Sequence, residues 1–512
     1  MGIFQSQQLS ATTPETSADM ELPESESVEF ESNHVCRTQE RISMSRQYHY
    51  QRSDNIEDIE DYRPGGYHPV ELGDVIENQY EVMLKLGHGG FSTVWLVHDT
   101  SSERFLAMKI VMAEASEEAF ETEKRLDEFE KSVNADQGFV GFSEARWWFQ
   151  GPNGNHLAIL SNWMGPSVAK FIEVTRLGTI SPEYSLNGKV AQRLALQITQ
   201  AVSSIHNRGI AHGDLTCSNV LLAINNLKLN NRSPREILNL VRGSSSMEQI
   251  TRIDGKPNKP TAPDYVYEGE DMAIPLLPFW TGDVKVIDFG SSYPLDSPPA
   301  DLQIPYSSCS PEYLLLQKVG KESDIWALGV LIYKLRSGKD LFAEVMGGDA
   351  EVIFQMEEVL GPIPYNKGPT VTTPERISGD ADEAVTGFKP LLRELIDAID
   401  DNHLLAHEDD GNRTRNGGGD SREEKAGEEG VLRTSQELPP QAQDHPGEEE
   451  NVRPDPMLST KKSGKEVQST KISPWEAELL YDLLSGSLNY DVEKRLNADQ
   501  MLRHPWFSMN FE

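Results

Sequence analysis

Cysteine and long apolar runs are scarce in this sequence, and each shortage excludes a class of protein. Its 512 residues include three cysteines, Cys36, Cys217 and Cys309, at no metal-ligand spacing. We therefore expect no disulfide framework, and a reducing compartment such as the cytoplasm or the nucleus. No apolar run approaches the roughly 18 residues of a membrane span, so no transmembrane segment is expected. The first residues also lack the basic start and apolar core of a signal peptide.

Positive charge is the third shortage. The chain has 47 Lys and Arg against 82 Asp and Glu, a formal net charge of -35. Nucleic acid is not expected as a direct partner, because its phosphates would be repelled. Acidity of this size instead favours basic substrates, or reflects solvated tails. Met1-Gly2-Ile3-Phe4-Gln5-Ser6 fits the pattern for N-myristoylation at Gly2. We favour a chance match, because a single acyl chain holds a membrane only marginally and the acidic residues that follow would oppose anionic lipid.

The stretch 205–222 places polar residues at fixed offsets ahead of an apolar run. His212, Asp214 and Asn219 precede Val220-Leu221-Leu222, so a buried strand would anchor a loop at a cleft. Asp214 can accept a proton from a hydroxyl, and Asn219 can offer a neutral oxygen to a metal ion. An isolated His-x-Asp has little weight, because most such residues form turns or lie on the surface. The interpretation therefore depends on the rest of a phosphotransfer site.

Two β-rich runs flank a glycine-rich turn that spans residues 87–94. Glycine lets backbone N–H groups approach phosphates without a Cβ, although an ordinary hairpin turn gives the same pattern. The next predicted strand, 105–111, has Lys109 within an apolar run. A lysine on a strand usually extends to water. Its position behind the glycine-rich turn favours a contact with the α- and β-phosphates instead.

A helix and a further strand complete the candidate site. Glu123 lies three residues from both Phe120 and Leu126, on the face that periodicity predicts to be buried. We take it as the ion-pair partner of Lys109, the alternative being a surface glutamate on an acidic helix. The strand 283–287 leads into Asp288-Phe289-Gly290, where a carboxylate after an apolar strand can reach Mg²⁺ at a cleft.

Three stretches lack the periodicity of packed elements. Residues 1–60 predict a disordered acidic tail, 223–282 predict an irregular insert, and 403–470 predict a disordered acidic insert rather than a domain boundary.

These motifs, in this order, resemble those of eukaryotic protein kinases and, within them, the SR-protein kinases of the CMGC group. The narrower resemblance depends on Gly65-Gly66-Tyr67-His68, on Phe91-Ser92-Thr93-Val94-Trp95-Leu96, and on the insert at 223–282, where that family has a spacer. It covers roughly 61–400 and 473–507. It implies an α+β bilobal fold over 61–507, with a β-rich N-lobe at about 77–164 that has one main helix. A mostly helical C-lobe would follow at about 165–507.

The resemblance also implies an activity, namely transfer of the γ-phosphoryl group of ATP, with Mg²⁺, to serine in Arg/Ser-rich proteins. Asp214 would be the catalytic base, with Lys109, Glu123 and Thr216 beside it, while Asn219 and Asp288 would hold the metal. The nucleotide would contact Leu86, Gly87, His88, Gly89, Gly90, Phe91, Val94, Ala107, Lys109, Asn162 and Met164. Arg495 would pair with Glu312, as scaffold residues, and we expect a monomer.

Two departures separate this chain from the family pattern. Gly213 replaces the arginine that pairs with a phosphorylated activation loop, so activity should not require that phosphorylation. Thr216 replaces a lysine near the transferring phosphoryl group, which predicts slower turnover or altered substrate choice. The alternative to an active kinase is a weakly active or inactive kinase-fold scaffold that binds ATP and that binds partners through its acidic surfaces.

Overall fold

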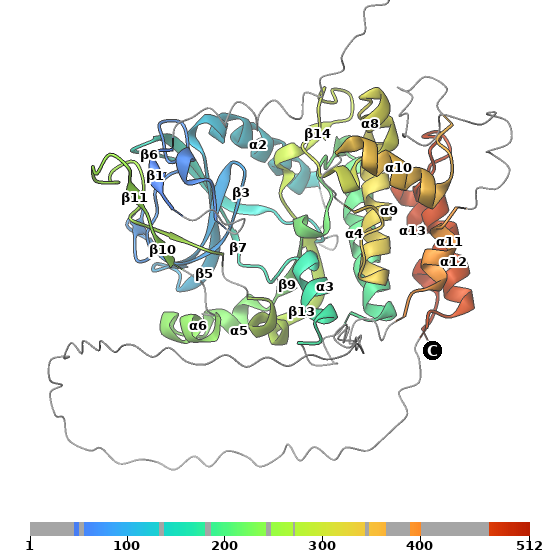
Figure 1. Ribbon diagram of the computed structural model, residues 1–512. Coiled ribbons are helices and arrows are strands. Elements are labelled where there is room, and N and C mark those ends of the chain that lie inside the picture. Colours follow the sequence, from blue (N-terminus) through green and yellow to red (C-terminus); the bar gives the residue numbers. More distant parts are fainter. Residues whose placement is uncertain are drawn as a thin grey trace, which may run out of the picture.

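Six antiparallel strands form one sheet in the first part of the molecule, a computed structural model that describes residues 46–50, 56–132, 138–179, 186–241, 247–269, 272–343, 348–364, 390–400 and 471–511 (Figure 1). The strands pair in the order β2-β3-β4-β5-β7-β6. Their bounds are β2 Val75–Ile76, β3 Tyr80–Gly89, β4 Ser92–Asp99, β5 Arg104–Val111, β6 Ser143–Gly151 and β7 Gly154–Asn162. One long helix, α2 Ser116–Ser132, packs on this sheet. This is the predicted β-rich lobe with its main helix.

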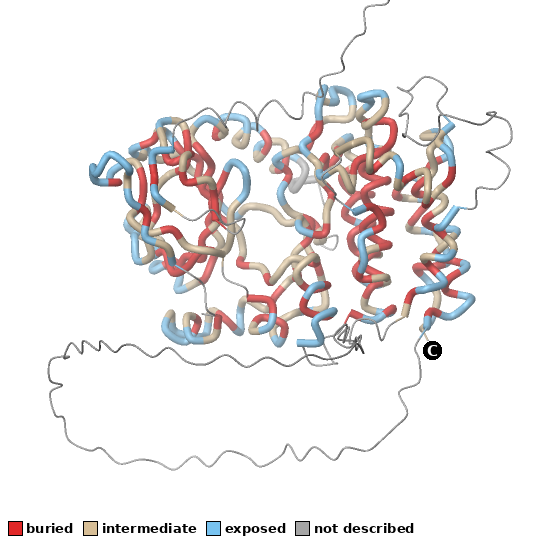
Figure 2. Tube along the Cα trace, viewed as in Figure 1, coloured by how far each residue is buried: buried red, intermediate tan, exposed pale blue. Residues whose placement is uncertain are grey.

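The second lobe is mostly helical. Its helices are α3 Val168–Arg176, α4 Gly188–His206, α8 Pro311–Leu316, α9 Lys321–Ser337, α10 Asp349–Leu360, α11 Leu392–Asp397, α12 Pro474–Ser487 and α13 Ala498–Leu502. Helix α9 has thirteen buried residues and is apolar on nearly all sides, as expected of a helix surrounded by others. Figure 2 shows α9 and the neighbouring α4 as the most buried part of this lobe. Among the described residues, no helix is long and apolar enough to cross a membrane.

Two small antiparallel pairs flank the loop that contains Asp214 and Asn219. Strand β9 Val220–Ile224 pairs with β13 Trp280–Val286, and β8 Ile210–Ala211 pairs with β14 Tyr293–Pro294. Short 3₁₀ helices lie at η2 Ile59–Asp61, η3 Ala113–Ala115, η5 Cys217–Asn219, η6 Leu277–Phe279, η7 Phe289–Ser291, η8 Tyr306–Ser308 and η11 Pro505–Ser508. The apolar run Val220-Leu221-Leu222 is thus a strand, as predicted, and it holds the loop before it.

The insert at 223–282 is ordered where the structure describes it, contrary to the prediction of an irregular stretch. It contains α5 Asn226–Asn230, α6 Pro234–Val241, β10 Met247–Gln249, β11 Thr251–Arg252, β12 Tyr265–Tyr267 and α7 Ala273–Leu276. Its short elements bury apolar side chains against the first lobe, among them Leu229 and Ile237 beside Phe105 and Trp163. Helices this short are marginal in isolation, so their order comes from these tertiary contacts.

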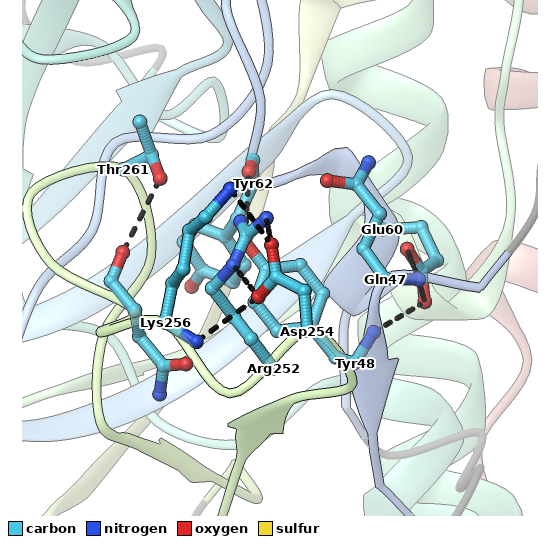
Figure 3. A network of polar contacts seen from close by, with 9 residues as sticks. Gln47, Tyr48, Glu60, Tyr62, Arg252, Asp254, Lys256 and Thr261 are labelled. Atoms are coloured by element: carbon cyan, nitrogen blue, oxygen red, sulfur yellow. Dashed lines mark hydrogen bonds and ion pairs between the residues drawn. The ribbon is translucent and has the colours of Figure 1, made fainter.

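The predicted disordered tail also extends too far. Strand β1 Tyr48–His49 pairs with β11 of the insert, and Tyr48, Ile56 and Ile59 are buried in a cluster shared with it. Figure 3 shows this junction, where Glu60 accepts hydrogen bonds from the backbone N–H of Gln47 and Tyr48. Residues 46–50 and 56–60 therefore belong to the folded unit. The predicted insert at 403–470 and Gly2 lie outside the described residues.

Candidate active site

The loop between β8 and β9 places Asp214 and Asn219 side by side. The Asn219 side-chain amide donates to the Asp214 backbone carbonyl at 2.8 Å and to Asp214 Oδ2 at 2.8 Å. The other carboxylate oxygen, Oδ1, is buried and has no hydrogen-bond partner among the described residues. Burial raises the pKa of Asp214, as do the charges of Asp288 and Asp324, against the opposing effects of His212 and Asn219. One oxygen is therefore fixed and the other is left to accept a proton.

Asp324, near the start of α9, holds this loop through hydrogen bonds. Its buried carboxylate accepts from the backbone N–H of His212 at 2.7 Å and of Gly213 at 3.0 Å, and it contacts His206 Nε2 at 2.9 Å. Burial acts to raise the pKa of Asp324, but these hydrogen bonds and the two histidines bring it below its usual value. Sequence reasoning missed this role. The available signal was one acid among the apolar residues 325–333, too common to assign.

Lys109 and Asp288 meet although 179 positions separate them. Lys109 Nζ donates to Asp288 Oδ1 at 2.8 Å, and its charge is the main reason that the pKa of Asp288 is lowered. Asp288 has a left-handed backbone, with φ 59°. The preceding Ile287 connects it to the loop that contains Asp214 and Asn219: its N–H donates to the Asn219 carbonyl at 2.9 Å, and its carbonyl lies 3.0 Å from His212 Nε2. Lys109, Asp214, Asn219 and Asp288 therefore belong to one site.

The predicted pair between Lys109 and Glu123 is not formed. Lys109 is directed to Asp288, whereas Glu123 Oε2 accepts from Ser143 Oγ at 2.6 Å and lies 4.0 Å from Arg146. Helical periodicity correctly placed Glu123 on the half-buried face of α2. That face, however, turns this carboxylate toward β6, and the strand residues there are its partners.

The predicted nucleotide contacts divide into two groups. Leu86, Val94 and Ala107 are half-buried like Lys109, and Val94 pairs directly with Lys109 across β4 and β5. The tip of the hairpin, Gly89, Gly90 and Phe91, is exposed. These residues follow one another along the β3–β4 hairpin and β5, as a nucleotide-covering loop requires.

Asn162 and Met164 lie on the segment that joins the lobes. The Asn162 side chain accepts from Arg104 Nη2 at 3.1 Å, and both residues line a cavity of about 590 Å³ together with Arg104, Ile224 and Lys285. The Asn162 side chain is therefore engaged with Arg104, and its backbone groups remain candidates for a base contact.

The two departures from the family pattern occupy different surroundings. Gly213 has φ 79°, and a Cβ added there would lie 2.3 Å from the Ser291 carbonyl oxygen, so any larger residue would displace the segment after Asp288. Thr216 precedes η5 in extended conformation, and its side chain makes no capping hydrogen bond.

The scaffold pair predicted from the sequence is confirmed. Arg495 Nη1 and Nη2 donate to the two oxygens of Glu312 at 2.7 and 2.8 Å, and both side chains are buried. This bidentate pair connects the residues near the start of α8 to the turn before α13.

A glycine-rich hairpin in a β-rich lobe, a helical second lobe, and a lysine–carboxylate pair and an aspartate–asparagine pair in one site are typical of two-lobed phosphotransferase folds. The family model described as "Protein kinase domain" matches residues 80–231 and 276–507, most of the chain. The chain belongs to the protein kinase family. The gap between the matched segments, 232–275, falls within the insert.

Among its relatives are several SR-protein kinases, in agreement with the resemblance seen in the residues. The chain is 36% identical over 178 residues to "Serine/threonine-protein kinase spk-1" of Caenorhabditis elegans, covering 33% of this chain and 17% of that protein. It is 32% identical over 174 residues to "SRSF protein kinase 3" of Homo sapiens, covering 33% and 30%. It is 27% identical over 330 residues to "Serine/threonine-protein kinase SRPK" of Physarum polycephalum, covering 60% and 73%. The first two alignments thus span under a third of each relative's length.

Proposed function

We propose that this chain is an ATP-dependent serine/threonine kinase that transfers the γ-phosphoryl group to serine in basic, Arg/Ser-rich proteins. The observation that carries the proposal is the meeting of two pairs, Lys109 with Asp288 and Asp214 with Asn219, through the hydrogen bonds of Ile287. Phosphoryl transfer needs a base, an anchor for the phosphates and a metal site in one place. Each of these groups is present among the four side chains.

Asp214 is the proposed base. Asn219 holds its Oδ2, while the unpartnered Oδ1 can accept the proton of the substrate hydroxyl. Its raised pKa makes it a better proton acceptor than an ordinary aspartate. Lys109 would hold the α- and β-phosphates, in exchange for its present contact with Asp288.

The residues present fit a magnesium ion. Asn219 uses its amide N–H groups on Asp214, which leaves its carbonyl oxygen available, and Asp288 adds a carboxylate with a lowered pKa. Two protein ligands suit Mg²⁺, which retains waters and takes the other ligands from phosphate oxygens. When bound, the ion would neutralise the charge that develops on the phosphates. Glu123, engaged with Ser143, has no part in this proposal.

Charge and relatives support the substrate class. A net charge of -35 favours Arg-rich segments through charge-assisted hydrogen bonds. The names of the relatives above include an SRSF protein kinase and an SRPK. We expect the chain to act as a monomer in the cytoplasm or the nucleus.

The test is phosphoryl transfer from labelled ATP, with Mg²⁺, to an Arg-Ser repeat peptide. Asp214→Ala should lower the rate by roughly 10² to 10⁴-fold, the usual contribution of a positioned base. The matched control is Asp296→Ala, an exposed acid on the segment after Asp288, which should change little. Equal rates in Asp214→Ala and the native chain would remove Asp214 from this role. No transfer to any basic peptide, with ATP still bound, would favour the scaffold alternative, which Thr216 and the unformed Lys109–Glu123 pair also suggest.

A further inference from the structure

The sheet of the first lobe carries an additional layer on the face opposite the nucleotide. Val94 and Lys109 pair on the inner face, so Trp95 and its partner Lys85 point to the outer face. There Lys85 forms a fully buried ion pair with Glu57, and Tyr62 donates to the same carboxylate at 2.6 Å. The N-terminal residues 56–68 therefore cover the outside of the glycine-rich hairpin.

Tyr67 connects this layer to the tip of the hairpin. Its buried ring lies 5.7 Å from that of Tyr62, and its hydroxyl donates to the carbonyl of Gly89 at 2.9 Å. Gly89 ends β3, and the exposed Gly90 and Phe91 follow it. Hairpin tips usually expose their backbone to water, so a buried tyrosine bound to such a carbonyl is a specific restraint on this loop.

Asn153, in the turn between β6 and β7, holds Tyr67 and links it to the insert. The buried side chain of Asn153 donates to the backbone carbonyl of Tyr67 at 2.7 Å and to that of Thr261, in the insert, also at 2.7 Å. A second insert residue, Gly269, lies so close to the hairpin that an added Cβ would be 3.1 Å from the Leu86 carbonyl oxygen and 3.2 Å from Gly87 Cα. Two separate parts of the chain thus contact the glycine-rich strand from outside.

The planarity of the peptide bond gives this restraint a chemical consequence. In a trans peptide the carbonyl of one residue and the N–H of the next point in opposite directions. The carbonyl of Gly89 is held by the hydroxyl of Tyr67, from the N-terminal layer, so the N–H of Gly90 points away from Tyr67; Lys109 lies on the face of the sheet opposite that layer. Backbone N–H groups of a glycine-rich loop are the donors that bind phosphate oxygens.

We propose that Tyr67 is a positioning residue that orients the Gly89–Gly90 peptide so that the N–H of Gly90 faces the phosphates of bound nucleotide. The proposal rests on the proposed function, because it assumes that phosphates bind under this hairpin. It assigns a role to the N-terminal segment and the insert, which together hold a loop that would otherwise lack a fixed orientation.

The test compares Tyr67→Phe with Tyr48→Phe in the full chain. Both variants remove one hydroxyl from the same buried cluster and keep the ring. The Tyr48 hydroxyl, however, donates to the Tyr62 carbonyl, at 3.5 Å, and interacts with Arg252, whereas that of Tyr67 donates to Gly89. The measurements are the dissociation constant of a fluorescent Mg²⁺–adenine nucleotide, hydrogen exchange of the amides at 89–91, the thermal midpoint, and KM and kcat for ATP.

For Tyr67→Phe we expect nucleotide affinity to fall by roughly three- to tenfold, the effect of losing one hydrogen bond. The amides at 89–91 should exchange faster by a similar factor, and KM for ATP should rise with kcat within about twofold, as for uniform binding. Tyr48→Phe should change none of these. Unchanged affinity and exchange in Tyr67→Phe, or equal changes in both variants, would overturn the proposal.

The failure of the proposed function would look different. If the native chain transfers no phosphate to peptides but binds nucleotide, the affinity and exchange comparisons still decide the role of Tyr67. If it binds no nucleotide, the kinase proposal fails, and Tyr67 loses its role toward phosphates with it.

Discussion

Restoring the family's arginine at position 213 should damage this chain rather than improve it. Gly213 has φ 79°, a conformation that costs an L-residue about 1–2 kcal/mol. An added Cβ would also lie 2.3 Å from the Ser291 carbonyl oxygen and 3.3 Å from the ring of Tyr293. Because Ser291 would have to move by about 1 Å, the pairing of β14 with β8 would weaken, at about 1 kcal/mol per lost hydrogen bond. We expect Gly213→Arg and Gly213→Ala to lose about 3 kcal/mol of unfolding free energy.

Gly209 supplies the matched control. It has φ 77°, nearly the same as Gly213, but nothing lies within 4 Å of its added Cβ. Gly209→Ala therefore carries only the backbone cost of about 1–2 kcal/mol. Urea unfolding of the two alanine variants, with the slope checked for constancy, isolates the close approach as their difference. Equal loss in both variants would show that Ser291 moves freely. A Gly213→Arg variant as stable and as active as the native chain would refute the reasoning.

Three further predictions concern the site. Because burial raises the pKa of Asp214, the acid limb of the kcat/KM profile should lie above about pH 4, the ordinary range of an aspartate. A pH profile measured with the Arg-Ser peptide tests this position. An acid limb at or below about pH 4 would contradict the prediction. Glu123→Gln should change kcat/KM by less than about threefold, because Glu123 does not contact Lys109, whereas Lys109→Met should lower kcat/KM more than roughly 100-fold. Equal losses in the two variants would mean that Glu123 replaces Asp288 as the partner of Lys109 during turnover. Asp324 has a lowered pKa in the folded chain, so its stabilisation is present above about pH 4 and is lost as pH falls through the folded value; Asp324→Asn should reduce the steepness of acid unfolding seen by circular dichroism.

Motifs with fixed spacing were the predictable part of this site. The loop around Asp214 and Asn219 is anchored by a strand that reads directly from the run Val220-Leu221-Leu222. The pair between Glu312 and Arg495 was also predicted, because a kinase resemblance assigns both positions. In both cases the structure adds distances and contacts to residues that the sequence had already assigned to the site or the scaffold.

Long-range choices between equivalent partners were not predictable. Lys109 had carboxylates on α2 and after β13 within its predicted reach, and periodicity says only which face of α2 is buried. The order of the insert was not predictable for a similar reason, because Tyr48 and Ile59 become buried only when the insert packs against them. Neither segment can bury enough surface alone, so each looks disordered when its sequence is considered separately.

The surroundings of Gly213 explain how the segment after Asp288 can be held without a phosphate. In the family pattern an arginine at this position binds a phosphorylated residue, which requires space for a long side chain. Here the main chain of Ser291 occupies that space, and Tyr293 continues the contact by pairing with Ala211 and donating its hydroxyl to the Gly320 carbonyl at 2.9 Å. In this chain, backbone pairing holds the segment, with no arginine at position 213. A phosphate on this segment would therefore find no arginine at position 213. Removal of such a phosphate should leave the position of Asp288 unchanged.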